Sequence, residues 1–179
     1  DLEGAYVAAV SFAGSRGRET AARDGHGTHV AGIIGARKNG VGVVGVAPKA
    51  GLISVKILGD DGSGSFTGIL RGIRWCITNA AAHNIRILSM SLGAPEAPPE
   101  LKRVLLAAKR AGLITVCASG NSGPGGDVDF PARLAQERLC IAVGSIDATE
   151  IVSGFSSRGP ALEAFGVVAP GGKVLSSYI

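Results

Sequence analysis

The stretch that decides the fold is LITVCASGN at residues 113–121, an apolar, β-branched run that ends in a Gly-Asn pair. Runs of this length bounded by turn residues are typical of buried strands. Three further runs share the pattern, at residues 52–58, 86–92 and 139–145. Their apolar character on both faces predicts a parallel sheet covered on each side.

Two amphipathic stretches alternate with these runs and predict helices. Their apolar residues recur at spacings of three and four, and two prolines, Pro98 and Pro99, precede the second stretch. These residues are Ile69, Leu70, Ile73, Cys76, Ile77 and Ala80 in the first, and Leu101, Val104, Leu105 and Ala108 in the second. Strands that alternate with helices predict an α/β fold, a three-layer sandwich with a mostly parallel central sheet.

Composition limits the class of protein. The 179 residues are 46% apolar and 18% charged, as in ordinary globular chains, so the whole chain is not disordered. A chain of this size buries roughly 70% of its surface, enough for one core, and we expect residues 1–179 to form a single domain. The net charge of +4 comes from scattered basic residues, so we expect no nucleic-acid partner.

The three cysteines, Cys76, Cys117 and Cys140, have no C-x-x-C spacing and sit among apolar neighbours. We expect small buried side chains here, not a disulfide framework or a zinc site. No run reaches the roughly 18 apolar residues of a membrane span, and no signal peptide opens the chain, so we expect no membrane partner. Because the chain starts at Asp1 and stops at Ile179 within apparent structure, we expect it to be a piece of a longer protein.

Ligands of parallel sheets bind beyond the carboxyl ends of the strands. This rule places a functional site at Ser91-Leu92-Gly93 and Ser119-Gly120-Asn121.

The motif DGHGTHVAG at residues 24–32 places His26 and His29 three residues apart at the start of an apolar stretch. The pair could bind a metal, serve a structural role, or provide one catalytic base. A metal pair of the H-E-x-x-H type needs a glutamate and a third ligand, and the motif has neither.

A second glycine-rich stretch, GVGVVG at residues 40–45, matches the dinucleotide-binding pattern G-x-G-x-x-G. That fingerprint must follow a strand and open a helix. Here it follows the predicted helix after His26 and runs into Val46-Ala47-Pro48, so the context disfavours a nucleotide site.

Several sequence blocks, taken in order, closely resemble those of the subtilisin-like serine peptidases, and the resemblance covers essentially the whole chain. Besides the motif at residues 24–32, the blocks are Gly45-Val46-Ala47-Pro48, Val55-Lys56-Ile57-Leu58, Asp61-Gly62-Ser63-Gly64, Ser89-Met90-Ser91-Leu92-Gly93, Ser119-Gly120-Asn121, Phe155-Ser156-Ser157-Arg158-Gly159-Pro160 and Ala169-Pro170-Gly171.

The resemblance implies roles for two catalytic residues in an endopeptidase that forms an acyl-enzyme. His26 would be the general base, with His29 a packing neighbour. The Asn121 amide would stabilise the oxyanion. Asn121 also suits a left-handed turn after Gly120, and that alternative stays open.

The resemblance also implies where a polypeptide substrate lies. It would extend between the backbone edges Gly62-Ser63-Gly64 and Ser91-Leu92-Gly93, as an added strand. Phe66 would line a distal side-chain pocket, although a core contact is an alternative. Ala118, Ser119 and Gly120 would line the pocket for the residue before the cut, with Asp129 at its floor favouring Arg or Lys.

A calcium ion is a further implication of the resemblance. Its ligands would be the Asn39 side chain, the Asp1 carboxylate and the backbone carbonyls of Arg37, Val41 and Val43. Oxygen ligands of this kind suit Ca²⁺. The family's N-terminal ligand lies outside the chain, so we expect an incomplete and weaker site.

Two motifs of the family's triad do not occur in the sequence: D-[ST]-G, which carries the orienting aspartate, and G-T-S-M, which carries the nucleophile. Asp24 is too close to His26 to replace the first. We therefore expect residues 1–179 to be inactive alone, and a peptide-binding pseudopeptidase is the alternative function. The resemblance also implies a monomer that is secreted or associated with the cell envelope.

Overall fold

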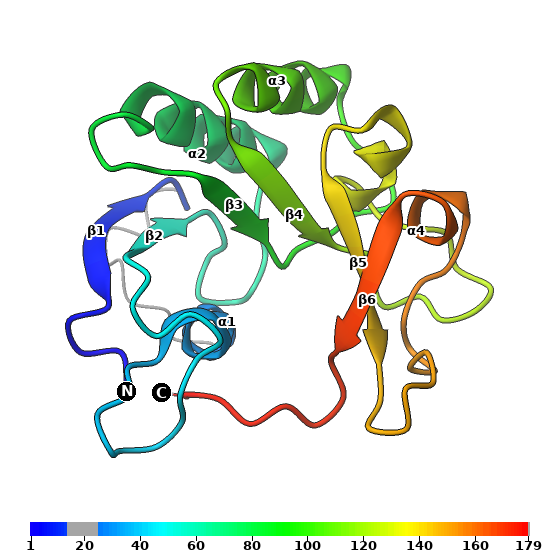
Figure 1. Cartoon of the computed structure of the whole chain (residues 1–179). Helices are drawn as coiled ribbons and strands as arrows, with labels where there is room; N and C mark the ends of the chain where they lie inside the picture. Colours follow the sequence, from blue (N-terminus) through cyan, green and yellow to red (C-terminus); the bar gives the residue numbers. More distant parts are fainter. Residues whose placement is uncertain (14–24, 179) are drawn as a thin grey trace. The chain divides into compact units, whose positions relative to one another are not determined.

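The computed structural model describes residues 1–13 and 25–178 (Figure 1). Their contacts group them into two compact units, which are treated separately below. The first comprises Asp1–Gly72 with residues 175–178, and the second comprises Ile73–Val174. The boundary between the units falls within helix α2, Phe66–Asn79.

The first unit pairs two parallel strands, β1 (Tyr6–Ser11) and β2 (Leu52–Lys56). The register shifts between Tyr6 and Ala8 and is then regular up to the pair Ser11–Lys56. Helix α1 (His26–Gly35) lies between them in sequence. It begins after Gly25, whose φ of 75° is in the left-handed region that glycine tolerates best.

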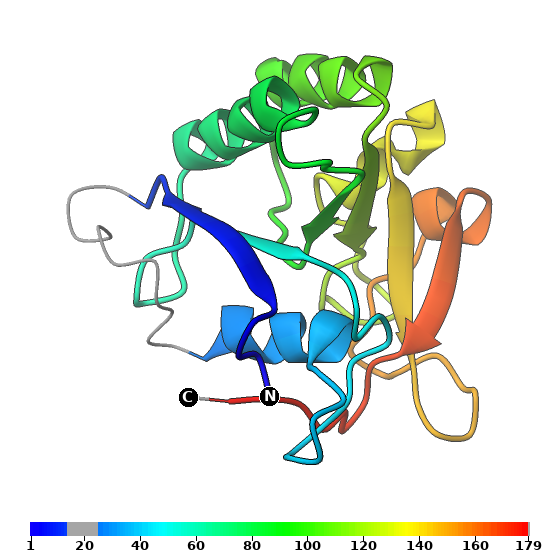
Figure 2. The same ribbon diagram turned by 60° about the vertical axis from the view of Figure 1, so that its left-hand side comes forward.

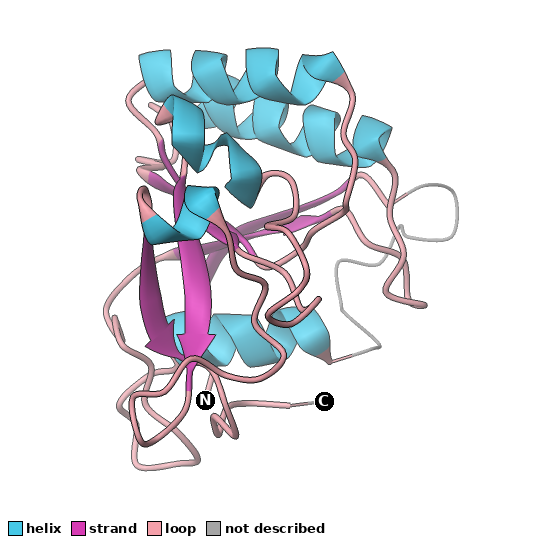
Figure 3. Cartoon of the chain, turned by 90° about the vertical axis from the view of Figure 1, so that its right-hand side faces the viewer, coloured by secondary structure: helices cyan, strands magenta, loops and turns pink. Residues whose placement is uncertain are grey.

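The second unit contains a four-stranded parallel sheet with the order β3-β4-β5-β6 (Figure 2). The strands are β3 (Ile87–Met90), β4 (Ile114–Ala118), β5 (Ile141–Ile146) and β6 (Gly166–Pro170). They alternate along the chain with helix α3 (Pro99–Arg110), the 3₁₀-helix η1 (Ala132–Glu137) and the short helix α4 (Pro160–Glu163). Figure 3 colours the helices cyan and the strands magenta. This sequential order is typical of right-handed parallel α/β folds.

The core of the second unit forms between α3, η1 and one face of the sheet. Helix α3 buries Leu101, Val104, Leu105 and Ala108, the apolar stripe expected from the sequence. The strands alternate between buried residues such as Leu88 and Cys117 and exposed ones such as Ile87, which is 60% exposed. The strands are therefore apolar on both faces, but the described residues bury one face much more than the other.

The parallel α/β fold is confirmed. All four predicted strands and both predicted helices are present, with ends that shift by a few residues. The sequence patterns missed β1 and β6. Among the described residues, no helix is long and apolar enough to cross a membrane.

Candidate functional site

His26 is the first residue of α1, and its side chain is exposed. A Cβ at the preceding Gly25 would lie 2.5 Å from Cζ of Tyr178, so the Tyr178 ring packs directly on this turn. The hydroxyl of Ser176 donates a hydrogen bond to the carbonyl oxygen of His29 at 2.6 Å. The segment 176–178 therefore fixes the start of the helix that presents His26. Asp24 lies outside the described residues.

His29 lies one turn further along α1 and is half-buried. Within residues 1–13 and 25–178, no three His, Cys, Asp or Glu side chains gather as a metal site would require.

The segment Gly62-Ser63-Gly64 is exposed at the tip of a tight turn in the first unit. The Gly59 amide donates to the Ser63 carbonyl at 2.7 Å, and Asp61 Oδ1 accepts from the Ser63 amide at 2.9 Å. These bonds hold an exposed backbone edge in a defined shape. Phe66 follows as the half-buried first residue of α2.

In the second unit, the segment 91–93 follows β3, and the segment 118–120 begins at the last residue of β4. Residues 129 and 130 hydrogen-bond to the chain next to both segments. The Asp129 amide donates to the Ser119 carbonyl at 2.9 Å. Phe130 and Ala94 exchange two backbone bonds of 2.8 and 3.0 Å. The structure therefore brings Gly93, the segment Ser119-Gly120 and Asp129 side by side.

The Asp129 side chain lies between two glycines of these segments. A Cβ at Gly93 would be 2.9 Å from Asp129 Oδ2, and a Cβ at Gly120 would clash with the same oxygen. Asp129 is half-buried. A carboxylate in this place can pair with a cationic group that enters between the two segments.

Asn121 is exposed directly after Gly120, whose φ is 104°. Two bonds from Ser157 hold this turn: its hydroxyl oxygen accepts from the Ser122 amide, and its amide donates to the Gly120 carbonyl, each at 3.0 Å. The Ser157 side chain is fully buried. No sequence pattern assigns a role to Ser157, although this residue lies in the block Phe155-Ser156-Ser157, which carries part of the resemblance.

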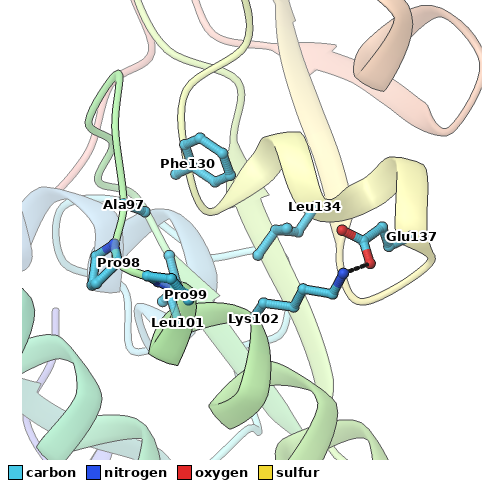
Figure 4. A pocket seen from close by; sticks show the side chains of 8 residues that line it. All are labelled: Ala97, Pro98, Pro99, Leu101, Lys102, Phe130, Leu134 and Glu137. Carbon is cyan, nitrogen blue, oxygen red and sulfur yellow. Dashed lines mark ion pairs between the residues drawn. The ribbon is translucent and has the colours of Figure 1, made fainter.

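A cavity of about 230 Å³ opens beside this region, between the start of α3 and η1 (Figure 4). Lys102 and Glu137 form an ion pair of 2.5 Å at its edge. The Phe130 ring lines it and is covered by the guanidinium of Arg133, which lies 4.8 Å from the ring centroid. No local sequence pattern predicts this cavity, because the residues that line it come from separate elements.

The predicted calcium loop is folded around Asp1. The Arg37 amide donates to the Asp1 carbonyl at 2.8 Å, and the Val43 amide donates to Asp1 Oδ2 at 3.4 Å. Asn39 Oδ1 accepts from the Val41 amide at 3.1 Å. The Asp1 carboxylate occupies the position that a Cβ at Gly42 would take. The Asp1 carboxylate and the Asn39 side-chain oxygen are ligands of the kind that a hard cation such as Ca²⁺ takes, and both accept hydrogen bonds in this structure.

The G-x-G-x-x-G stretch at residues 40–45 lies in this same loop. It follows α1 and leads to β2 without opening a helix. The structure therefore lacks the strand and helix that a dinucleotide fingerprint needs at this point of the chain.

The predicted site residues divide between the two units. His26, Gly62-Ser63-Gly64, Phe66 and the calcium loop belong to the first unit. Asn121, Asp129 and the segments 91–93 and 118–120 belong to the second.

Comparison with known proteins identifies relatives of this chain. The sequence model of the Subtilase family matches residues 6–178. Subtilisin Savinase of Lederbergia lenta is 42% identical over 155 residues, which are 87% of this chain and 54% of that protein. Subtilisin E of Bacillus subtilis (strain 168) is 40% identical over 152 residues, or 85% of this chain and 38% of that protein.

A solved structure, that of Sphericase, superposes with a TM-score of 0.86 at 30% identity. The match covers 99% of this chain and 63% of that one. The chain thus spans about half, or less, of the curated relatives that it matches.

Proposed function

Because the chain belongs to the Subtilase family, we propose that it supplies part of the active site of a serine endopeptidase that hydrolyses polypeptides. The family match over residues 6–178 carries this proposal. The exposure of His26 at the start of α1 and of Asn121 after β4 supports it, because both side chains are open to a substrate.

His26 acts as the general base in this proposal. It takes the proton of a serine hydroxyl as the serine oxygen bonds to the scissile carbonyl carbon. The C–N bond then breaks, and the leaving amine departs with that proton. Water hydrolyses the acyl-enzyme by the same route. His29, whose backbone is tied to Ser176, has a packing role.

Asn121 supplies an amide donor to the oxyanion of the tetrahedral intermediate. Such a donor is aimed at charge that exists only in the transition state, and its removal costs about 2.7–4 kcal/mol of barrier. The bonds from Ser157 to the residues on either side of Asn121 restrict the turn, which lowers the entropy lost when the donor is used.

The backbone segments Gly62-Ser63-Gly64 and Ser91-Leu92-Gly93 bind the extended substrate, and Phe66 contributes to a distal pocket. Asp129, between Gly93 and Gly120, favours Arg or Lys before the cut, because its carboxylate can pair with a cationic side chain. Ala118, Ser119 and Gly120 form the wall of that pocket.

The loop around Asp1 holds Ca²⁺ through Asp1, Asn39 and the carbonyls of Arg37, Val41 and Val43. A bound ion stabilises the folded chain, because it has no comparable site in the unfolded one. We also propose that the protein works as a monomer, secreted or attached to the cell envelope.

The motifs D-[ST]-G and G-T-S-M do not occur in the sequence, so neither the orienting aspartate nor the nucleophilic serine comes from residues 1–179. We therefore expect no turnover and no labelling by a fluorophosphonate probe when this chain is assayed alone.

A chimera tests the proposal. Residues 6–178 replace the matching segment of Subtilisin Savinase, and we expect the rest of that protein to supply the two motifs that the family's triad needs. We expect the chimera to hydrolyse peptide substrates and to react with the probe. His26→Ala should abolish turnover, whereas His29→Ala, the matched control, should keep it.

A folded chimera without turnover would reject the endopeptidase. If that inactive chimera bound an extended peptide with measurable affinity, the function would be that of a peptide-binding pseudopeptidase. Circular dichroism of each variant separates loss of folding from loss of chemistry.

A further inference from the structure

A single arginine, Arg133, contacts four consecutive residues of the segment that carries Asp129. Its Nε donates a hydrogen bond to the Val128 carbonyl at 2.7 Å, and its Nη2 pairs with Asp127 Oδ2 at 3.2 Å. Its guanidinium carbon lies 4.8 Å from the centroid of the Phe130 ring, and its backbone amide donates to the Asp129 carbonyl at 2.9 Å. Arg133 therefore ties all four residues to the first turn of η1.

This segment follows a glycine-rich loop. Residues 122–126 read Ser-Gly-Pro-Gly-Gly, and glycine has more conformational freedom to lose on folding than any other residue. A Cβ at Gly125 would meet nothing within 4 Å, so no neighbouring atoms restrain the loop closely at that point. Contacts from outside the loop, those of Arg133 among them, therefore set where Asp127 and Val128 lie.

The contacts of Arg133 are better shielded from water than those of an ordinary surface ion pair. Its side chain is 30% exposed, whereas that of Arg103, which pairs with Glu100 on α3, is 77% exposed. Val128 is fully buried, so its carbonyl has little water to replace the hydrogen bond from Arg133. The planar guanidinium makes this bond, the ion pair and the contact with the Phe130 ring at the same time, which the single ammonium group of a lysine cannot do.

The charge of Arg133 is engaged by Asp127 and not by Asp129. A guanidinium pairs readily with a carboxylate, so an arginine free to reach Asp129 would compete with a cationic substrate for it. In the part of the chain that the structure describes, no basic side chain forms an ion pair with Asp129. Its carboxylate, held against Gly93 and Gly120, therefore stays available to a group that enters there.

We propose that Arg133 is a positioning residue for the substrate preference of the peptidase. It holds residues 127–130 so that the Asp129 carboxylate lies between Gly93 and Gly120, where the Arg or Lys side chain before the cut enters. This inference rests on the proposed function, because it deepens the role given there to Asp129. Arg133 acts through Asp129 and makes no contact of its own with the substrate.

Substitution of Arg133 separates positioning from a direct effect of its charge. Arg133→Gln removes a positive charge near Asp129. If Arg133 only repelled a cationic substrate through space, this change would improve cleavage after Arg. If Arg133 positions Asp129, the same change loosens the segment, and cleavage after Arg becomes slower. Arg133→Lys keeps the charge but loses the planar fork, so it should resemble Arg133→Gln.

The test measures kcat and KM of the Savinase chimera with two peptides that differ only in having Arg or Leu before the cut. We expect Arg133→Gln to lower kcat/KM for the Arg peptide, relative to the Leu peptide, by about three- to tenfold, because part of a charge-assisted bond is lost. The loss should appear mainly in KM, because the bond to Asp129 forms in the bound substrate and in the transition state alike. Arg103→Gln, the matched control, should leave both peptides unaffected.

A double variant shows whether Arg133 acts through Asp129. Adding Arg133→Gln to Asp129→Asn should not lower the Arg-to-Leu ratio further than Asp129→Asn alone. The inference is wrong if the two effects add, or if Asp129→Asn lowers the ratio while Arg133→Gln leaves it unchanged or raises it. If Asp129→Asn itself leaves the ratio unchanged, the role of Asp129 in the proposed function is wrong, and the inference fails with it.

Hydrogen exchange provides a readout that does not depend on turnover. The Asp129 amide donates to the Ser119 carbonyl at 2.9 Å, and this bond should open more often when Arg133 no longer holds the segment. In the 179-residue chain, Arg133→Gln should therefore speed exchange of the Asp129 amide severalfold, and Arg103→Gln should not change it. Equal exchange rates in the two variants would contradict the inference even if the chimera were inactive.

Discussion

Gly120 and Asp129 pack so closely that the Asp129 carboxylate fills the space into which any side chain at Gly120 would project. Gly120 also has a φ of 104°, in the region that side chains rarely adopt. Both constraints act at Gly120, the residue before Asn121. The position of the Asn121 side-chain amide therefore depends on a glycine at residue 120.

Gly120→Ala should therefore lower the free energy of unfolding by about 1–3 kcal/mol. Backbone strain at the positive φ and the clash of the new Cβ with Asp129 both destabilise the folded chain. The matched control is Gly125→Ala, since a Cβ at Gly125 meets nothing within 4 Å. This control should change stability by less than about 0.5 kcal/mol. Urea unfolding of both variants checks the pair, and equal effects would contradict the account.

Ser157→Ala removes the hydroxyl that accepts from the Ser122 amide at 3.0 Å. The Ser157 side chain is fully buried, but Ser122 is exposed, so water can partly replace the lost acceptor, and we expect a loss of about 0.5–1.5 kcal/mol in unfolding free energy. Ser89→Ala, at an exposed position of β3, is the control and should be nearly neutral. Faster hydrogen exchange of the Ser122 amide should accompany the first variant only.

Asp129→Asn in the Savinase chimera removes the charge between Gly93 and Gly120 but keeps the shape of the side chain. A charge-assisted bond is worth about 1.5–3 kcal/mol, so kcat/KM for substrates with Arg before the cut should fall at least about tenfold. Substrates with Leu at that position should be cleaved as before. Equal changes for both substrates would show that Asp129 does not face the substrate.

Calcium should raise the midpoint of thermal unfolding of the chain, and a chelator should reverse the rise. The size of the shift follows the logarithm of the ion concentration relative to its Kd. Asp1→Ala should abolish the response, because it removes the carboxylate against Gly42 and Val43. Glu3→Ala, an exposed acidic residue nearby in sequence, should leave it intact. A response that survives Asp1→Ala would place the ion elsewhere.

The elements that sequence patterns locate well are those with strong local signals. Strands such as β4 are continuous apolar runs, and α3 has a clear apolar stripe after two prolines. Strand β1 was missed because Tyr6–Ser11 has two alanines, a weak strand former, at its centre. Its pairing with β2 joins residues far apart in sequence, which no local pattern reports.

The candidate site was only partly visible in the sequence for a similar reason. The motifs located His26, Asn121 and the loop segments around them. The packing of Asp129 against Gly93 and Gly120 and the hydrogen bonds of Ser157 join segments that are distant in sequence. Such contacts depend on tertiary packing, which spacing along the chain does not encode.

The most direct test of the central claim is the kinetic effect of Asn121→Ala in the Savinase chimera. If Asn121 stabilises the oxyanion, kcat should fall by about 10²–10³ while KM changes little, because the bond forms only in the transition state. An unchanged kcat in a folded variant, or a loss confined to KM, would contradict the role assigned to Asn121 and the mechanism built on it.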